Sequence, residues 1–211
     1  MINVSFPLWQ ISYGENRIYA VVPPAINRFD IKPIQIKDAE DVTVFDDALR
    51  KATTGNDAGT RKALAPLMAS PNEGSRATAM LIDAALLLQK RDLDGAAKLY
   101  GQIAKDKDIP EPWRDLALVR QTSVQYDRLA PDEVITRLSP LAIKRNPWFG
   151  SAGEMVAIAY LKKNRVQPAA KLFADIAADP KVPESIRGRA KTMSASLNAR
   201  LAVPAEQGQA K

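Results

Sequence analysis

The side chains on which most hydrolases and metalloenzymes rely are absent from this sequence. Its 211 residues contain no histidine and no cysteine. Their absence excludes ordinary Ser-His-Asp and Cys-His nucleophiles, imidazole and thiolate metal ligands, and disulfide bonds. Catalysis would have to rest on carboxylates, lysine or tyrosine. The composition therefore predicts a protein that is not an enzyme, with no catalytic residue and no cofactor.

Two pairs of aspartates have the alternate spacing of a calcium-binding loop. Asp92 precedes Asp94, and Asp106 precedes Asp108. Neither run continues with the glycine and the distal glutamate that such a loop needs. We interpret these residues as solvated turns and expect no metal site. The stretch from 55 to 62 is rich in glycine but lacks the Gly-Lys-Ser/Thr ending of a phosphate loop, so it is interpreted as a turn between helices.

The formal net charge of +6 and the pI near 9.5 raise nucleic acid or anionic lipid as partners. Paired basic residues, however, tend to close predicted helices, where cations complement the negative end of the helix dipole. These pairs are Lys90-Arg91, Lys144-Arg145 and Lys162-Lys163. The single local cluster, Arg187 to Lys191, contains no aromatic residue. We therefore expect no nucleic-acid partner.

The elements that carry these residues are indicated by an internal repeat. The segment Ala96 to Tyr100 returns, 73 residues later, as Ala169 to Phe173. The same offset carries Asp106 onto Asp179 and Arg114 onto Arg187. Agreement in register over more than twenty positions indicates a duplicated structural unit. The equivalence of Arg114 and Arg187 also suggests a shared structural bond to the preceding turn.

Half of the offset is about 36 residues, which points to a third, diverged copy between the two clear ones. Its apolar positions are Val134, Leu138, Leu141 and Ala142. Units of about 34 residues made of two antiparallel helices are of the tetratricopeptide type. The last copy fits that pattern with small, aromatic and apolar residues at the expected places, namely Ala157, Tyr160, Ala169, Phe173 and Ile176.

The predicted fold class is all-α, a tetratricopeptide-like helical-hairpin solenoid of about nine helices with a non-helical N-terminal arm. The predicted helices are 40–53, 58–68, 73–90, 93–105, 112–126, 131–144, 148–163, 166–178 and 183–202. Asn72 and Asn146 are expected to begin two of them as N-caps, and Pro131 opens a third. The chain would thus comprise an irregular arm (1–38), the solenoid (39–203) and a disordered tail (204–211).

The N-terminal arm does not match the repeats. Prolines at positions 7, 23, 24 and 33 prevent a long helix, and strand-prone residues leave room for one short strand from Arg17 to Val22. The stretch Phe6 to Ile26 contains Glu15 and Arg17, so it is not a transmembrane helix of about 20 apolar residues. It is not a signal peptide either, because no basic start precedes a continuous apolar run.

Four stretches carry a family resemblance. They are Ala84 to Lys90, Trp113 to Gln121, Asn146 to Met155 and Val182 to Arg187. In these, and from about Phe45 onward, the chain resembles a family of tetratricopeptide-like proteins of proteobacterial inner membranes, related to the ancillary subunit of the Sec translocon. It is most similar to the alphaproteobacterial branch.

The resemblance implies a non-enzymatic, periplasm-facing solenoid tethered by one N-terminal transmembrane helix, which meets translocon subunits and periplasmic chaperones. Residues 1–40 contain no such anchor, so we expect membrane attachment only through an anchor missing from this chain. The implied function is a protein-protein interaction scaffold in protein export or envelope protein biogenesis, at the periplasmic face of the inner membrane. The alternative is a soluble cytoplasmic tetratricopeptide scaffold or assembly chaperone. This alternative follows if the absence of the anchor is genuine.

Tetratricopeptide stacks bind peptides or proteins in the groove lined by the first helix of each pair. Arginine and aromatic residues on those helices are the candidate partner contacts, because they dominate interface energetics. The candidates are Arg114, Arg120, Gln121 and Tyr126 on one helix, and Trp148, Phe149 and Glu154 on the next. For Trp148 and Phe149 the alternative is packing of the helix start onto Leu141.

Overall fold

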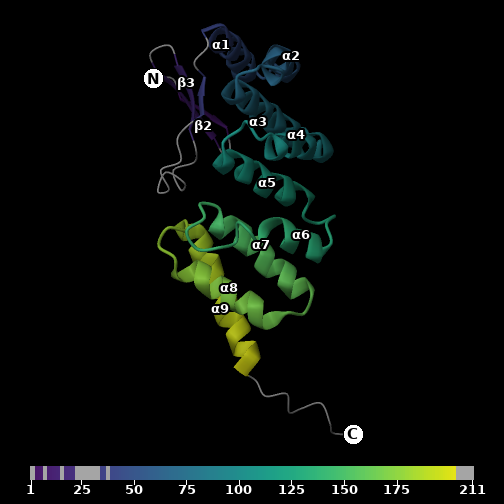
Figure 1. The fold of residues 1–211 in the computed structure, drawn as a ribbon, viewed down its shortest axis with the longest axis vertical. Coiled ribbons are helices and arrows are strands. Elements are labelled where there is room, and N and C mark those ends of the chain that lie inside the picture. Colours follow the sequence, from purple (N-terminus) through teal and green to yellow (C-terminus); the bar gives the residue numbers. More distant parts are fainter. Residues whose placement is uncertain (1–2, 7–8, 15–16, 22–33, 37–38, 203–211) are drawn as a thin grey trace. The chain divides into compact units, whose positions relative to one another are not determined.

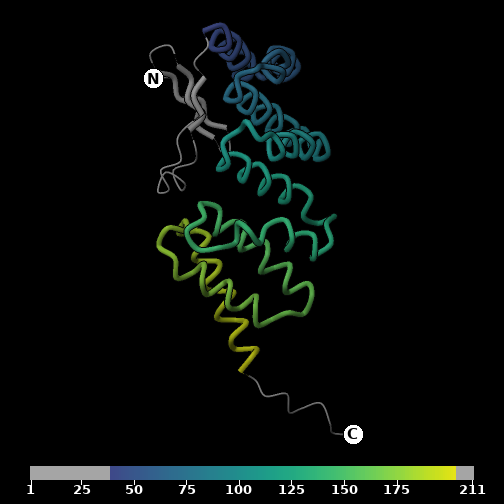
Figure 2. The backbone as a smooth tube through the Cα atoms, in the orientation of Figure 1, coloured from purple at the N-terminus to yellow at the C-terminus, as the bar shows by residue number. Residues whose placement is uncertain are grey.

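The computed structural model describes residues 3–6, 9–14, 17–21, 34–36 and 39–202. Figure 1 shows their elements, and Figure 2 traces the backbone in the same orientation. The N-terminal arm is non-helical, as predicted, but it contains four short strands instead of one. β1 (Asn3–Phe6), β2 (Trp9–Gly14), β3 (Arg17–Val21) and β4 (Ile34–Ile36) pair antiparallel in that order. The strand predicted from Arg17 to Val22 is β3. None of the four prolines that exclude a helix lies within these strands.

Nine helices follow in the described part of the chain, and the predicted all-α, tetratricopeptide-like solenoid is confirmed. They are α1 (Ala39–Thr53), α2 (Asp57–Met68), α3 (Glu73–Gln89), α4 (Leu93–Lys105), α5 (Glu111–Gln125), α6 (Pro131–Leu138), α7 (Phe149–Lys162), α8 (Val166–Ala178) and α9 (Glu184–Ala202). The tail predicted from residue 204 lies outside the described residues.

The chain divides into two compact units, Met1–Gln125 and Tyr126–Lys211, here called the N-terminal unit and the C-terminal unit. Within the N-terminal unit each helix from α1 to α5 packs on the next. The C-terminal unit repeats this arrangement from α6 to α9, and α7 also contacts α9 directly. Contact mainly between neighbours along the chain is the packing expected of a solenoid.

The 73-residue repeat extends to the boundaries and turns of the helices. α4 and α8 both have 13 residues and start at equivalent positions, as do α5 and α9. The turn before α4 contains Arg91 with φ of 61°, and the turn before α8 contains Asn164 with φ of 57°. After the two helices, Asp106 and Asp179 each accept a backbone hydrogen bond from the residue two positions later, at 3.1 and 2.9 Å. The duplication thus covers the connections as well as the helices.

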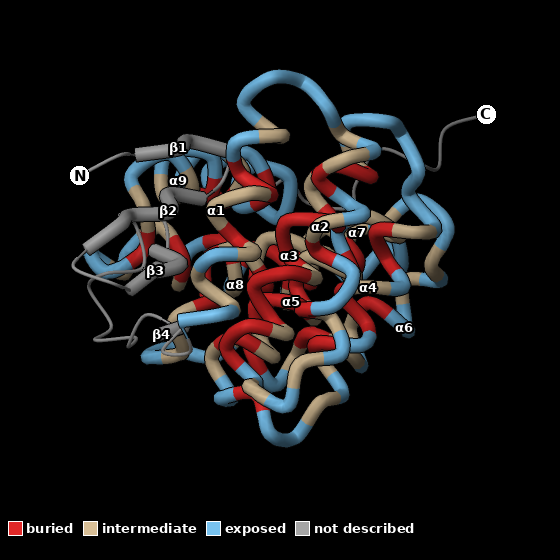
Figure 3. The backbone as a smooth tube through the Cα atoms, turned by 90° about the horizontal axis from the view of Figure 1, so that it is seen from above, coloured by how far each residue is buried: buried red, intermediate tan, exposed pale blue. Residues whose placement is uncertain are grey.

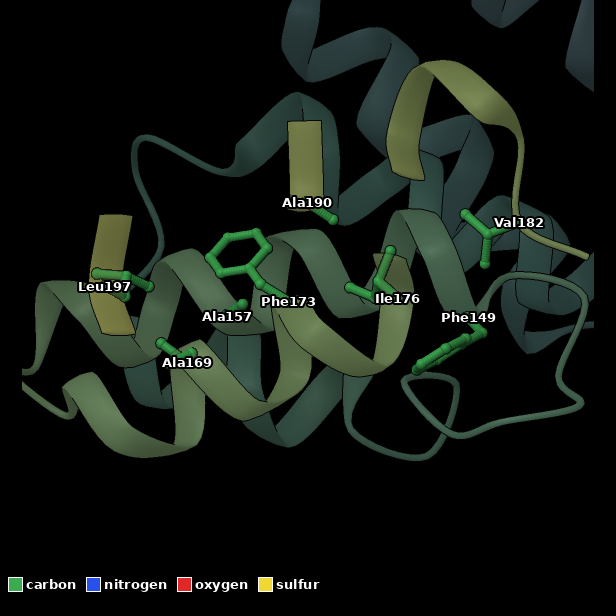
Figure 4. Close-up of a cluster of buried hydrophobic side chains, with 9 residues drawn as sticks. Phe149, Ala157, Ala169, Phe173, Ile176, Val182, Ala190 and Leu197 are labelled. Carbon is green, nitrogen blue, oxygen red and sulfur yellow. The ribbon is translucent and has the colours of Figure 1, made fainter. Parts of the chain in front are cut away.

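The core of the C-terminal unit is built from the small and aromatic residues that the repeat pattern predicts. Ala157, Ala169, Phe173 and Ile176 are buried together between α7, α8 and α9, as Figure 4 shows. Small residues permit close approach here: a Cβ at Gly153 would lie 2.9 Å from Ile176 Cδ1. Figure 3 marks the buried residues in red. In the N-terminal unit, α3 is buried over most of its length.

Two predicted boundaries were wrong. The helix predicted for 131–144 ends at Leu138, because Pro140 has no N–H to continue the helical hydrogen bonds. The chain continues through turns to α7. Asn146 does not cap α7 directly. Its Oδ1 accepts from Trp148 N at 2.8 Å in a preceding turn, and the helix begins at Phe149.

Candidate partner-binding site

An open, mainly apolar groove lies between α7 and α9 of the C-terminal unit. Its volume is about 510 Å³. It is lined by Glu154 and Ile158 of α7, Phe173 of α8, and Gly188, Arg189, Thr192 and Met193 of α9. α7 and α9 are the first helices of successive hairpins, which line the partner-binding face in tetratricopeptide stacks. The groove therefore occupies the place where the sequence pattern predicts partner contacts; we call it the α7–α9 groove.

An ion pair joins the two sides of the α7–α9 groove. Arg189 Nε and Nη2 donate to the two carboxylate oxygens of Glu154 at 2.8 and 2.7 Å. Such a two-point contact fixes both side chains in one plane, and the carboxylate raises the pKa of Arg189. The side chain of Arg189 is 56% exposed and that of Glu154 is 21% exposed. Glu154, a predicted site residue, thus lines the groove with its charge already balanced.

The same positions in the first copy of the repeat carry different chemistry. Glu154 and Arg189 correspond to Leu81 and Leu116, which are 3% and 1% exposed. Two buried leucines in the N-terminal unit are therefore replaced together by an ion pair in the C-terminal unit. This joint departure from the repeat is a sequence signal for the groove.

Most residues of the α7–α9 groove were not predicted from the sequence as site residues. Those missed are Ile158, Phe173, Gly188, Arg189, Thr192 and Met193. Single-helix patterns do not reveal them, because they come from three helices that meet only in the fold. A comparison of the two copies position by position would have pointed to the Glu154–Arg189 pair and to the surface around it.

Tyr126 is tied to the C-terminal unit by two contacts. It follows α5 directly, and its hydroxyl donates to the Met155 carbonyl oxygen of α7 at 3.1 Å. Lys162 Nζ lies 4.4 Å from the centre of its ring, a cation–π contact. Partial burial raises the pKa of Tyr126. The residue therefore holds Lys162 in place at the end of α7.

The other candidates on α5 belong to the N-terminal unit. Gln121 packs against Gly101 of α4, since a Cβ at that glycine would lie 2.5 Å from Gln121 Nε2. Arg120 is half-buried, and desolvation lowers its pKa while the nearby Tyr100 opposes the shift. Gln121 thus has a packing role within the N-terminal unit.

The expected structural bond of Arg114 and Arg187 is not formed by their Nε atoms. Both Nε atoms are buried and neither has a hydrogen-bond partner. Arg187 Nη2 reaches Glu184 Oε2 at 3.9 Å, within its own helix. The two arginines are thus equivalent in the burial of Nε, and the predicted bond to the preceding turn is not made by this atom in either residue.

Trp148 and Phe149 are buried where α7 begins. They are 5% and 3% exposed, and Phe149 belongs to the core cluster of the C-terminal unit in Figure 4. Their burial supports the packing alternative. They stabilise the start of α7 and present little surface to a partner.

Two further grooves are lined by the second helices of the two repeat copies, α4 and α8. One, of about 520 Å³, is formed by α2, α3 and α4, and the other, of about 360 Å³, by the turns that follow α6 together with α7 and α8. Lys98 and Leu99 line the first, and their equivalents Lys171 and Leu172 line the second. In the first groove Arg61 pairs with the buried Asp83, whose equivalent is Val156. These grooves are thus a regular feature of the repeat.

The aspartates with metal-like spacing have structural partners. Asp92 caps α4 by accepting from Gly95 N at 2.8 Å. Asp106 accepts from Arg76 Nε at 2.8 Å, and this bond is the main cause of its lowered pKa. Among the described residues no group of three or more acidic side chains is placed to hold a metal ion. In the same part of the chain, no helix combines the length and apolar character that crossing a bilayer requires.

Comparisons with protein-family models, curated proteins and solved structures give no significant match for this chain. The family resemblance drawn from the four sequence stretches therefore remains a prediction.

Proposed function

We propose that this chain is a non-enzymatic protein-protein interaction scaffold that acts in protein export or envelope protein biogenesis at the inner membrane. The observation that carries the scaffold part is the α7–α9 groove. It is open, largely apolar and built mainly from the first helices of two hairpins, with the partly exposed Ile158 and Met193 available for contact with a partner side chain. The export part rests on the sequence resemblance.

The chemistry of the groove favours a protein or peptide as partner. The partly exposed Ile158 and Met193 give nonpolar contact area, and methionine adapts its shape to different partners. The Glu154–Arg189 pair supplies a polar rim, as is usual around the apolar centre of protein interfaces. Translocon subunits and periplasmic chaperones are the partners that the resemblance implies.

Site-specific photocrosslinking in intact host cells tests this proposal. A photoreactive amino acid at Thr192, an exposed groove residue, should capture a protein partner. The matched control is Ala174, which is also exposed but lies on α8 away from the groove lining. Recovery of translocon or chaperone components from Thr192 and not from Ala174 would support the proposal.

Capture of other proteins without any translocon or chaperone component would overturn the export role. Fractionation of the same cells then separates the two candidate locations. Release of the chain with periplasmic or inner-membrane fractions is expected here, and recovery with cytosolic proteins would favour the alternative of a cytoplasmic scaffold or assembly chaperone.

A further inference from the structure

The excess positive charge of this chain is confined to one unit. Residues 1–125 contain 16 basic and 16 acidic residues, whereas residues 126–211 contain 14 basic and 8 acidic residues. The formal net charge of +6 therefore belongs entirely to the C-terminal unit, which also holds the α7–α9 groove. A positive field raises the association rate and the local concentration of acidic partners.

Two cations follow the apolar part of the groove. Arg189, Met193, Ser196 and Arg200 are spaced by four, three and four residues, which places them along one side of α9. On α7 the same reasoning aligns Glu154, Ile158 and Lys162. Both lines lead from the Glu154–Arg189 pair, past apolar lining residues, to a basic residue in or near the last turn of the helix.

These two cations, Lys162 and Arg200, carry charge that no carboxylate among the described residues neutralises. Lys162 rests on the ring of Tyr126, which orients it without neutralising it. Arg189, in contrast, is already bound at two points by Glu154. The groove thus combines an apolar centre, a neutral pair towards one end and unpaired positive charge towards the other.

We propose that the α7–α9 groove binds an acidic segment of a partner protein, in which one bulky apolar side chain is flanked by carboxylates. The apolar side chain enters beside Ile158, Phe173 and Met193. The carboxylates meet Lys162 and Arg200. This inference rests on the proposed scaffold function and specifies the chemistry of the partner.

Binding of short labelled peptides to the full chain tests the inference. The probe is a capped peptide with one phenylalanine between aspartates, measured by fluorescence anisotropy at low ionic strength. Comparison peptides carry serine for phenylalanine, or lysine for aspartate. We expect each comparison peptide to bind at least about tenfold more weakly than the probe. Added salt should lower the affinity of the probe. Equal binding of the lysine peptide, or of the serine peptide, would overturn the inference.

Two variants connect the binding to the groove. A Cβ at Gly188 meets no atom within 4 Å, so Gly188→Leu fills the groove without disturbing the helix. Arg200→Glu reverses the charge on the groove side of α9. Each substitution should lower the affinity for the probe peptide by about fivefold or more. The matched control is Lys191→Glu, the same change in charge on the same helix but off the groove line, which should have less than about a twofold effect.

Other outcomes identify what would replace the inference. If Lys191→Glu lowers the affinity for the peptide as much as Arg200→Glu does, the binding is a general charge effect and the groove is not the site. If vesicles containing phosphatidylglycerol bind in an Arg200-dependent way and no peptide does, the surface meets an anionic membrane instead. Capture of a protein at Thr192 in cells, together with no acidic-peptide binding, would leave the scaffold function and discard this inference alone.

Discussion

Glu154 and Arg189 show how a few substitutions can change a surface without changing the fold. The first copy of the repeat has buried leucines at both positions, whereas the second has an ion pair that is partly exposed. An exposed pair of this kind contributes only about 0–1 kcal/mol to stability. Its main consequence is therefore the polar edge that it gives to an otherwise apolar groove.

The pair formed by Arg76 and Asp106 predicts a pH effect on stability. Hydrogen bonding from Arg76 lowers the pKa of Asp106, so the folded state favours the ionised carboxylate. The stabilisation is present above the unfolded pKa and is lost as the pH falls below the ordinary aspartate range and through the lowered folded pKa. Asp106→Asn keeps the oxygen that accepts from Asp108 N but removes the charge. We expect this substitution to lower the free energy of unfolding by about 1–2 kcal/mol near neutral pH.

Urea unfolding of the wild type and Asp106→Asn at several pH values measures this effect. The difference in the free energy of unfolding between the wild type and Asp106→Asn should become smaller as the pH is lowered. Asp175→Asn is the matched control, because Asp175 also has a lowered pKa but pairs with the more exposed Lys144 and Lys171. A difference that persists unchanged at low pH would contradict the assignment of the effect to the ionised carboxylate.

Gly188 predicts a stabilising substitution. It is a glycine inside α9, it has no neighbouring atom within 4 Å of an added Cβ, and its φ is not in the left-handed region. Gly188→Ala should therefore raise the free energy of unfolding by about 0.5–1 kcal/mol. Thermal unfolding followed by circular dichroism checks the change. Gly55→Ala is the control with the opposite sign, because φ at Gly55 is 73°.

At the scale of the element, α4 and α8 differ in how their first turns are closed. Asp92 caps α4 through the amide of Gly95, whereas the equivalent Arg165 makes no side-chain cap. The equivalent of Gly95 is Pro168, which has no N–H to offer. The cap and its donor are thus both missing from the second copy. The start of α8 must rely more on packing.

This difference predicts unequal effects of the same substitution. Asp92→Ala should destabilise the protein by about 1 kcal/mol, because it leaves an amide of the first turn without its partner. Arg165→Ala should cost less, since only its contact with the Tyr160 ring is lost. Chemical denaturation of both variants provides the comparison. Equal losses would show that the cap contributes little to α4.

The helices α4, α5, α8 and α9 could be predicted from the sequence because the repeat shows the same pattern twice. α4 and α8 were predicted with their observed limits, while α6, which has no clear copy, was predicted six residues too long. The groove could not be predicted in the same way. Phe173 and Ile158 are ordinary core-type residues in the sequence, and only the packing of α7, α8 and α9 places them beside Arg189.

At the scale of the whole molecule, the two compact units predict local effects of core substitutions. Phe173 and its equivalent Tyr100 are both buried, each in its own unit. Phe173→Ala should cost about 3–5 kcal/mol and lower the hydrogen-exchange protection of α7 to α9 more than that of α1 to α4. Tyr100→Ala should show the reverse distribution. Equal loss of protection in both units after either substitution would mean that they unfold as one.

The matching turns before α4 and α8 also make the chain extensible. Leu93 opens one helix and Arg165 directly precedes its counterpart, so the 73 residues between these limits form a closed module. A second copy of this module, inserted after Arg165, would join the end of α7 to a new α4 through the type of turn that already connects α3 with α4. Each insertion would add one more copy of the four helices from α4 to α7, so the length of the helical array could be chosen by the number of modules.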